Sequence, residues 1–134
     1  MTSITIPEGV TSIGAYAFRN CSGLTRVSLP DSLKQIGTYA FNNCDALTGT
    51  LVIPDGVLTI GDYAFNDCDG ITGLELGSNV QTIGSYAFEY CDALTGDLIL
   101  PDSLTSLGSY AFHNCTKLNG TLKLSESMTS MPNC

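Results

Sequence analysis

The string "IGTYAFNNC", residues 36–44, recurs four more times in nearly the same form. The other copies read "IGAYAFRNC", "IGDYAFNDC", "IGSYAFEYC" and "LGSYAFHNC". Their cysteines are separated by 23, 24, 23 and 24 residues, and the glycine, tyrosine and phenylalanine keep the same steps. Such repetition is the signature of a repeat architecture, so one unit must explain the whole chain. The five cysteines are Cys21, Cys44, Cys68, Cys91 and Cys115.

Each unit has two halves. The first is a short alternating run that ends at proline or a stand-in, as in "RVSLP" and "TLVIP", which predicts a strand. The second half, as in "SLKQIGTYAFNNC", has apolar residues at roughly helical spacing, which predicts one or two helical or 3₁₀ turns. Gly37 is expected at a tight or positive-φ junction, where a Cβ would clash. The helically spaced residues are Leu33, Ile36, Ala40 and Cys44.

A unit of 23–24 residues cannot bury its own apolar face, whereas stacked copies can. Six strands are therefore expected side by side and parallel, about 4.8 Å apart, with helical turns on the other side. The inserted residue of the 24-residue units precedes the strand and should leave its in-and-out alternation intact. One layer of the core is expected to contain Leu24, Val27, Leu29, Leu33, Ile36, Ala40, Phe41 and Cys44.

The pattern L-x-x-(x)-L-x-L-P-x-x-L-x-x-I-G-x-Y-A-F-x-x-C closely resembles the BspA-like leucine-rich repeats, over residues 2 to about 131. The resemblance implies a curved solenoid with a parallel sheet on its concave face. It also implies a surface-exposed or secreted protein that binds other proteins, often host or matrix components. The predicted fold is thus an α/β solenoid, a leucine-rich-repeat right-handed superhelix with short helical or 3-10 turns on its convex face. The chain departs from the pattern at Gly77, Ser125 and Pro132.

A single leucine-rich-repeat domain is expected over residues 1–134, with about five and a half repeats and no terminal caps. Because the repeats begin almost at once with "SITIP" and no targeting signal precedes them, a fragment of a longer protein is the preferred interpretation. No apolar run approaches the ~20 residues that cross a bilayer, so no membrane insertion is expected. A location outside the cell or on its surface is implied by the resemblance alone.

Acidic residues outnumber basic ones by thirteen to five, which gives a net charge of −8. Between Lys34 and Lys117 there is no Lys or Arg. Nucleic acids and anionic membranes require basic contacts, so neither is expected as a partner.

The six cysteines raise the question of a disulfide framework. Five share one structural position, and five cannot pair completely. Buried reduced thiols that act as small hydrophobic side chains are therefore expected, with no disulfide among them. Cys134 is out of phase and is expected to be exposed and able to cross-link two chains. A linear ladder of thiols cannot place four ligands around one zinc ion, and "FNDCDG" lacks the first and last ligands of a calcium loop.

No motif supports catalysis. The one histidine, His113, falls in a variable position and is expected to be an exposed side chain rather than a general base. No nucleophile motif or glycine-rich phosphate loop occurs. The chain is therefore not expected to be an enzyme, and no catalytic residue, cofactor or metal is predicted. The other copies have Arg19, Asn42, Asn66 and Glu89 where this one has His113.

Function is expected where the copies disagree. The outward strand positions vary between copies, whereas the glycine, tyrosine, alanine, phenylalanine and cysteine hardly change. Stacked repeats form extended surfaces that suit binding, and unconstrained solvent positions are the alternative interpretation. The predicted function is a protein-interaction module of an adhesion-type surface or secreted protein. The candidate binding residues are Arg26, Ser28, Thr50, Val52, Glu75, Asp97, Ile99, Thr121 and Lys123, beside Ser3, Thr5 and Gly73.

Two further alternatives stay open. A solenoid without caps exposes apolar layers and strand edges, so copies could stack end to end as homodimers or longer arrays, and the chain would then be structural. The tyrosine column suits either a structural stack, which we prefer, or a binding platform.

Overall fold

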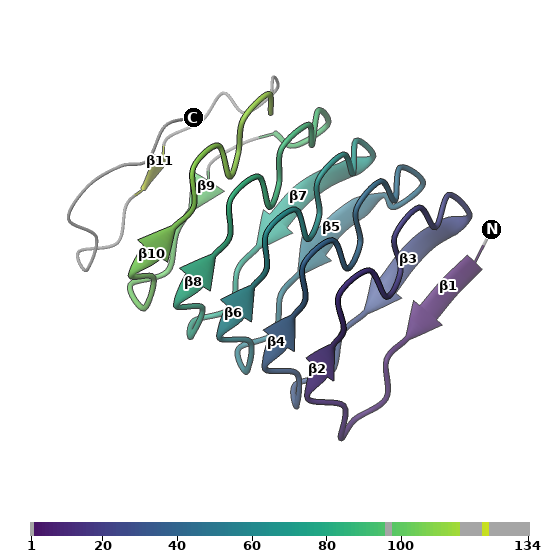
Figure 1. The fold of residues 1–134 in the computed structure, drawn as a ribbon, viewed down its shortest axis with the longest axis horizontal. Coiled ribbons are helices and arrows are strands. Elements are labelled where there is room, and N and C mark those ends of the chain that lie inside the picture. Colours follow the sequence, from purple (N-terminus) through teal and green to yellow (C-terminus); the bar gives the residue numbers. More distant parts are fainter. Residues whose placement is uncertain (1, 96–97, 116–121, 124–134) are drawn as a thin grey trace.

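The computed structural model of the chain describes residues 2–95, 98–115 and 122–123. Within these residues it contains eleven β-strands and no helix (Figure 1). Longer and shorter strands alternate along the sequence, and successive turns of the chain stack on one another (Figure 1). The architecture is therefore a solenoid, as predicted, but one made of strands and turns.

The longer strands carry the alternating runs of the repeats, and the shorter strands precede each repeated glycine. We call the first row the longer strands, although β9 and β11 have two residues each: β1 (Thr2–Thr5), β3 (Leu24–Ser28), β5 (Gly49–Val52), β7 (Ile71–Glu75), β9 (Leu98–Ile99) and β11 (Leu122–Lys123). The shorter strands are β2 (Ser12–Ile13), β4 (Gln35–Ile36), β6 (Thr59–Ile60), β8 (Thr82–Ile83) and β10 (Ser106–Leu107).

All strand pairs are parallel, but the two rows of strands differ in continuity. The short strands form one five-stranded sheet in the order β2, β4, β6, β8, β10. The long strands form three separate pairs, namely β1 with β3, β5 with β7 and β9 with β11. The expectation of six adjacent strands in one ladder is therefore wrong: the ladder is interrupted between β3 and β5, and no pairing joins β7 to β9 among the described residues.

The alternation of the longer strands tolerates the inserted residue, as predicted. In the β5–β7 pair, Thr50 lies opposite Gly73 and Val52 lies opposite Glu75. The register shifts between Gly49 and Thr50, and Gly49 has a φ of +78°. Glycine reaches this left-handed conformation without a steric penalty. The β1–β3 pair has the same shift between Thr2 and Ser3, so the shift does not depend on the inserted residue.

The expected helical or 3₁₀ turns are absent from the described part of the chain, and backbone hydrogen bonding explains why. Tyr39 and Asn43 have φ values of 59° and 58°, in the left-handed region that ends a helix. The N–H groups of Tyr39, Phe41 and Asn43 donate to carbonyls of the next repeat, at 3.0, 2.7 and 2.8 Å. The intervening N–H of Ala40 bonds within its own turn, to the Gly37 carbonyl. Every second donor thus joins two repeats, and a helix would withdraw those donors from the stack.

Gly37 is a point of close approach between repeats. A Cβ added there would lie 2.7 Å from the backbone nitrogen of Ala15 and 2.8 Å from the Ile13 carbonyl oxygen. The predicted clash is confirmed, whereas a positive φ at Gly37 is wrong, because the left-handed residue of this turn is Tyr39.

The core is a column of identical layers. Leu33, Ile36, Ala40, Phe41 and Cys44 are each no more than 1% exposed. The phenylalanine rings stack between neighbouring repeats, with centroids 5.1–5.3 Å apart. The predicted layer is confirmed for these residues and for Leu24. Val27 and Leu29 are only partly buried, on the strand beside the first interruption.

Candidate binding face

The outward residues of the longer strands form one exposed surface, which we call the strand face. Of the twelve outward positions predicted from the sequence, the structure describes nine in full, and these nine make up the strand face. The side chains of Ser3, Thr5, Arg26, Ser28, Thr50, Val52, Glu75 and Ile99 are exposed, and Gly73 is partly exposed. Asp97 and Thr121 lie outside the described residues, as does the side chain of Lys123, whose backbone pairs with Ile99.

The strand face is chemically mixed. Val52 and Ile99 are large apolar side chains with 53% and 60% of their surface exposed. Glu75 sits beside Val52 on the neighbouring strand, and Arg26 lies two strands away on β3. The face therefore offers isolated apolar and charged side chains among the hydroxyl groups of Ser3, Thr5, Ser28 and Thr50.

A hollow interrupts the strand face between β3 and β5, where the two strands are not paired. Its first part has a volume of about 470 Å³ and is lined by residues of β1, β3 and β5 and by Leu47, Thr48 and Ile71. A second part, of about 260 Å³, continues along the same two strands toward Pro54 and Asp31. The two parts share Val27, Ser28 and Thr50. We call this opening the β3–β5 gap.

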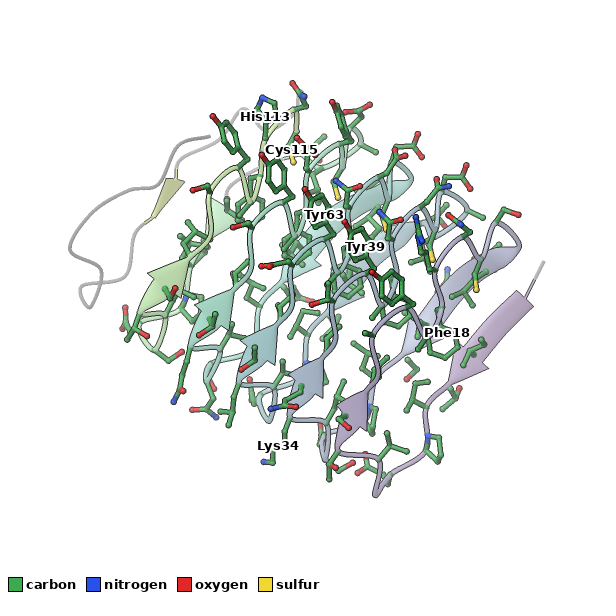
Figure 2. All side chains as sticks on the ribbon, viewed as in Figure 1. Phe18, Lys34, Tyr39, Tyr63, His113 and Cys115 are labelled. Atoms are coloured by element: carbon green, nitrogen blue, oxygen red, sulfur yellow. The ribbon has the colours of Figure 1, made fainter. Side chains whose placement is uncertain are left out.

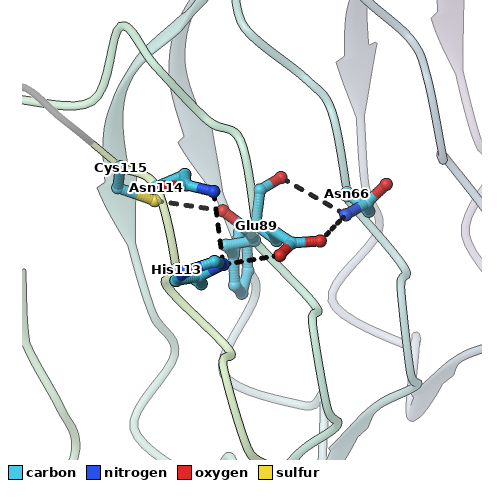
Figure 3. A network of polar contacts seen from close by, with 6 residues as sticks. Asn66, Glu89, His113, Asn114 and Cys115 are labelled. Atoms are coloured by element: carbon cyan, nitrogen blue, oxygen red, sulfur yellow. Dashed lines mark hydrogen bonds and ion pairs between the residues drawn. The ribbon is translucent and has the colours of Figure 1, made fainter. Parts of the chain in front are cut away.

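The turns that contain the repeated phenylalanines carry a ladder of polar side chains. Asn42 Nδ2 donates to Asn66 Oδ1 at 2.9 Å, and Asn66 Nδ2 donates to Glu89 Oε1 at 3.1 Å. Glu89 Oε2 lies 2.7 Å from His113 Nδ1 (Figure 3). Arg19 Nε starts the ladder by donating to Asn42 Oδ1 at 3.3 Å.

The ladder corrects the interpretation of His113 and its equivalents. Asn42 and Glu89 are each only 8% exposed, and His113 is partly buried with a carboxylate partner. The side chain after each phenylalanine differs between copies, yet in all five it takes part in the hydrogen-bond chain. The position is variable but it is not simply exposed.

The cysteines form a second ladder, inside the stack. The Sγ atoms of Cys44, Cys68, Cys91 and Cys115 donate to phenylalanine carbonyls of the preceding repeat, at 3.0, 3.2, 3.3 and 3.1 Å. All five repeat cysteines are free thiols, which confirms the absence of a disulfide among them. Burial raises the pKa of Cys44 to about 11 and raises that of Cys68 further. The thiols of Cys44 and Cys68 are therefore neutral donors at physiological pH.

The tyrosines form a third column, at the surface. The rings of Tyr16, Tyr39, Tyr63, Tyr86 and Tyr110 stack in order, with centroids 4.6–5.3 Å apart. Figure 2 shows Tyr39 and Tyr63 one above the other on the same side of the solenoid. The predicted stack is confirmed. The Arg19 guanidinium lies 5.5 and 5.4 Å from the first two ring centroids, within the range of a cation–π contact.

Within residues 2–95, 98–115 and 122–123, no three His, Cys, Asp or Glu side chains are grouped to hold a metal ion. The same residues contain no helix long and apolar enough to cross a membrane.

Stacked parallel strands, with one layer of core per repeat, define a leucine-rich-repeat solenoid. The chain belongs to the family described as "BspA type Leucine rich repeat region", which matches residues 1–119 in six copies. No protein with a curated description matches the chain.

Solved structures of bacterial leucine-rich-repeat proteins are similar to it. The leucine-rich repeat protein of T. pallidum is 34% identical, with a TM-score of 0.83, over 89% of this chain and 57% of that one. One from Bacteroides ovatus is 31% identical, with a TM-score of 0.88, over 98% of this chain and 36% of that one. A leucine-rich cell surface protein from Faecalibacterium prausnitzii is 30% identical, with a TM-score of 0.57, over 98% and 43%. The chain thus spans about half the length of these proteins or less.

The sequence predicted the outward residues but not the β3–β5 gap. The signal that could have found it is the step of 24 residues from Pro30 to Pro54, against 23 from Pro7 to Pro30. The polar ladder was also missed, although every copy has a hydrogen-bonding side chain directly after its phenylalanine.

Proposed function

We propose that this chain is a protein-interaction module of a surface or secreted protein and that it binds its partner through the strand face. The observation that carries the proposal is the contrast between positions. The residues that stack are nearly identical in every copy, whereas the exposed residues of the longer strands differ in size, polarity and charge. Uniform positions hold the layers together, so the variable ones are available for recognition.

Two considerations support binding over catalysis, and a third supports an extracellular setting. Repeat solenoids bind partners along an extended surface rather than in a single enclosed site. The hollows of the strand face contain no pair of titratable groups placed as acid and base. The similar protein from Faecalibacterium prausnitzii is described as a cell surface protein, which supports an extracellular setting for this chain as well.

The test compares variants of the two faces in parallel. Replacement of Glu75 and Asp97 by Ala should weaken binding of a partner protein captured by the wild-type chain from an extracellular matrix extract. Gln35→Ala with Ser106→Ala, on the sheet of short strands, is the matched control and should bind normally. Both double variants should melt within about 2 °C of the wild type, because Glu75, Gln35 and Ser106 are exposed and surface substitutions change stability little. A partner that binds both variants as tightly as the wild type would refute use of the strand face.

End-to-end assembly of the chain remains a prediction. Light scattering over a concentration series measures it directly, since a mass that stays at 14.1 kDa throughout rules it out.

A further inference from the structure

We propose that the β3–β5 gap binds an extended peptide segment of the partner protein as an added strand, with an acidic side chain of the peptide beside Arg26. The inference rests on the proposed function and makes it specific, because it names one part of the strand face and the conformation of the segment that binds there.

Strands β3 and β5 lie farther apart than two paired strands do. Nearly all Cα–Cα separations between β3 and β5 exceed 8 Å, whereas paired strands lie about 4.8 Å apart. A strand placed midway between two others requires roughly 10 Å from one to the other. The repeats meet again at both ends of the gap. Thr48 N–H donates to the Thr25 carbonyl at 3.2 Å, and a Cβ on Gly56 would lie 2.4 Å from the Asp31 carbonyl oxygen.

On the β3 side, one residue presents its backbone to the gap. Ile6 N–H donates to the Ser28 carbonyl at 3.0 Å, so Ser28 and Arg26 turn their backbone groups toward β1. Successive residues of a strand turn these groups to opposite sides. Val27 therefore directs its N–H and C=O toward β5, with no strand paired to it there.

On the β5 side, two residues do the same. Ile53 N–H donates to the Glu75 carbonyl at 2.8 Å, so Leu51 and Ile53 direct their backbone N–H and C=O groups toward β7. Thr50 and Val52 consequently direct their N–H and C=O groups toward the gap. Backbone groups without a partner favour pairing with another chain, and strand addition is a recurring mode of peptide recognition.

The side chains around the gap suit a peptide with one acidic residue. Val27 and Leu51 supply apolar surface, and Ser28 and Thr50 supply hydroxyl groups. Arg26 is the one cationic side chain that lines the gap, and Asp31 lies at the far end. An acidic residue of the peptide is thus favoured next to Arg26 and disfavoured near Asp31. The lining has no aromatic ring on which a sugar could stack, which favours a peptide over a glycan.

The probe is a phage-displayed library of linear twelve-residue peptides, selected on the wild-type chain. We expect enrichment of sequences with one Asp or Glu in a stretch of β-branched residues. A synthetic peptide of the enriched sequence is then titrated by fluorescence anisotropy. Arg26→Gln and Val52→Pro should each weaken its binding about tenfold or more, the loss of roughly one hydrogen bond or charge pair.

Val52→Pro is informative because the backbone N–H that it removes, together with the valine side chain, faces the gap and is not used in the β5–β7 ladder. The β5–β7 ladder uses Leu51 and Ile53 instead, so the variant should keep its fold. Ile99→Ser, on the same face but away from the gap, is the matched control and should bind the peptide normally. Methylation of single peptide nitrogens should abolish binding at consecutive positions in the bound stretch, which a side-chain-only contact would not cause.

Hydrogen exchange adds a readout that does not depend on a variant. In the free chain the amides of Val27, Thr50 and Val52 should exchange faster than those of Ile53 and Ser28, and the peptide should protect them. Protection of all five in the free chain, or selection of no peptide, would overturn the inference. If a partner protein binds through Glu75 and Asp97 but ignores Arg26→Gln and Val52→Pro, the gap proposal fails while the proposed function stands. Binding to a glycan array instead of to peptides would likewise refute it.

Discussion

The thiol of Cys68 donates a hydrogen bond to the backbone carbonyl of Phe41, across the boundary between two repeats, with sulfur and oxygen 3.2 Å apart. The same contact recurs at Cys44, Cys91 and Cys115. The cysteine therefore contributes a donor as well as apolar volume, which accounts for its presence in every copy.

Replacement of Cys68 separates these two contributions. Cys68→Ala removes the donor and leaves a small void, so we expect a loss of about 1–3 kcal/mol in the free energy of unfolding. Cys68→Ser retains a donor and should lose less. Urea denaturation followed by circular dichroism measures both. A serine variant less stable than the alanine variant would mean that the sulfur acts as a hydrophobic group alone.

The thiols of Cys44 and Cys68 should be unreactive until the solution is strongly alkaline. Burial raises the pKa of Cys44 to about 11, above the ordinary value of about 8.5. A group with a raised folded-state pKa stabilises the fold below the unfolded value and loses that contribution as pH rises toward the folded one. Native Cys44 and Cys68 should therefore resist iodoacetamide at pH 8 and the chain should lose stability from about pH 9 to 11, measured by peptide mapping and thermal melting. Rapid native alkylation of either at pH 8 would contradict their burial.

Gly37 and Gly14 occupy equivalent positions with different surroundings. A Cβ at Gly37 would strike the backbone of the preceding repeat, whereas a Cβ at Gly14 would have no atom within 4 Å. Gly37→Ala should therefore lower the unfolding free energy by about 3 kcal/mol or more, and Gly14→Ala should change it by less than about 0.5 kcal/mol. Equal effects in denaturant titrations would show that the close approach is relieved by a small shift of the backbone.

Replacement of the Asp67 carboxyl by an uncharged group should stabilise the folded chain. Burial, followed by the charges of Asp69, Asp45, Asp92 and Glu89, raises the pKa of its carboxyl. The charged form is thus disfavoured in the folded chain, and stability should rise as pH falls through the folded pKa.

The substitution to test is Asp67→Asn, because Asp67 also has a φ of 61°, which asparagine tolerates well. The variant should melt about 1–2 °C higher at pH 7 and should lose this advantage at pH 3, where the carboxyl is protonated. Scanning calorimetry at both pH values checks it, and an advantage that persists at pH 3 would point to the backbone instead of the charge.

Asn66 is the centre of the polar ladder. Asn66→Ala would remove the side-chain acceptor of Asn42 Nδ2 and the donor to Oε1 of the largely buried Glu89, so a loss of about 1–3 kcal/mol is expected. Ser109→Ala, an exposed position on the neighbouring turns, is the control and should be near neutral. A double-mutant cycle with Glu89→Gln should return a coupling above about 0.5 kcal/mol. Additive effects would mean that the contact contributes nothing.

The repeat spacing was sufficient to predict the solenoid, because only stacked copies bury the apolar residues of so short a unit. The same spacing predicted the outward residues, since the alternation of a strand is a local property. Helical spacing of Leu33, Ile36 and Ala40 misled, because the periodicity of a buried face does not reveal where the N–H groups donate. In the structure those donors bond to the next repeat, and the turn forms without a helix.

The sequence by itself determined the number of layers, their composition and the positions free to vary. The tertiary structure decided which neighbouring strands pair, which turn residues adopt a left-handed backbone and which side chains form ladders. These features depend on the distances between repeats, and many hydrogen bonds and stacked aromatic rings set those distances together. A one-residue difference in repeat length, between the 23-residue and 24-residue units, is visible in the sequence. Whether it is absorbed in a bulge or in an opening such as the β3–β5 gap is settled only when the copies are stacked.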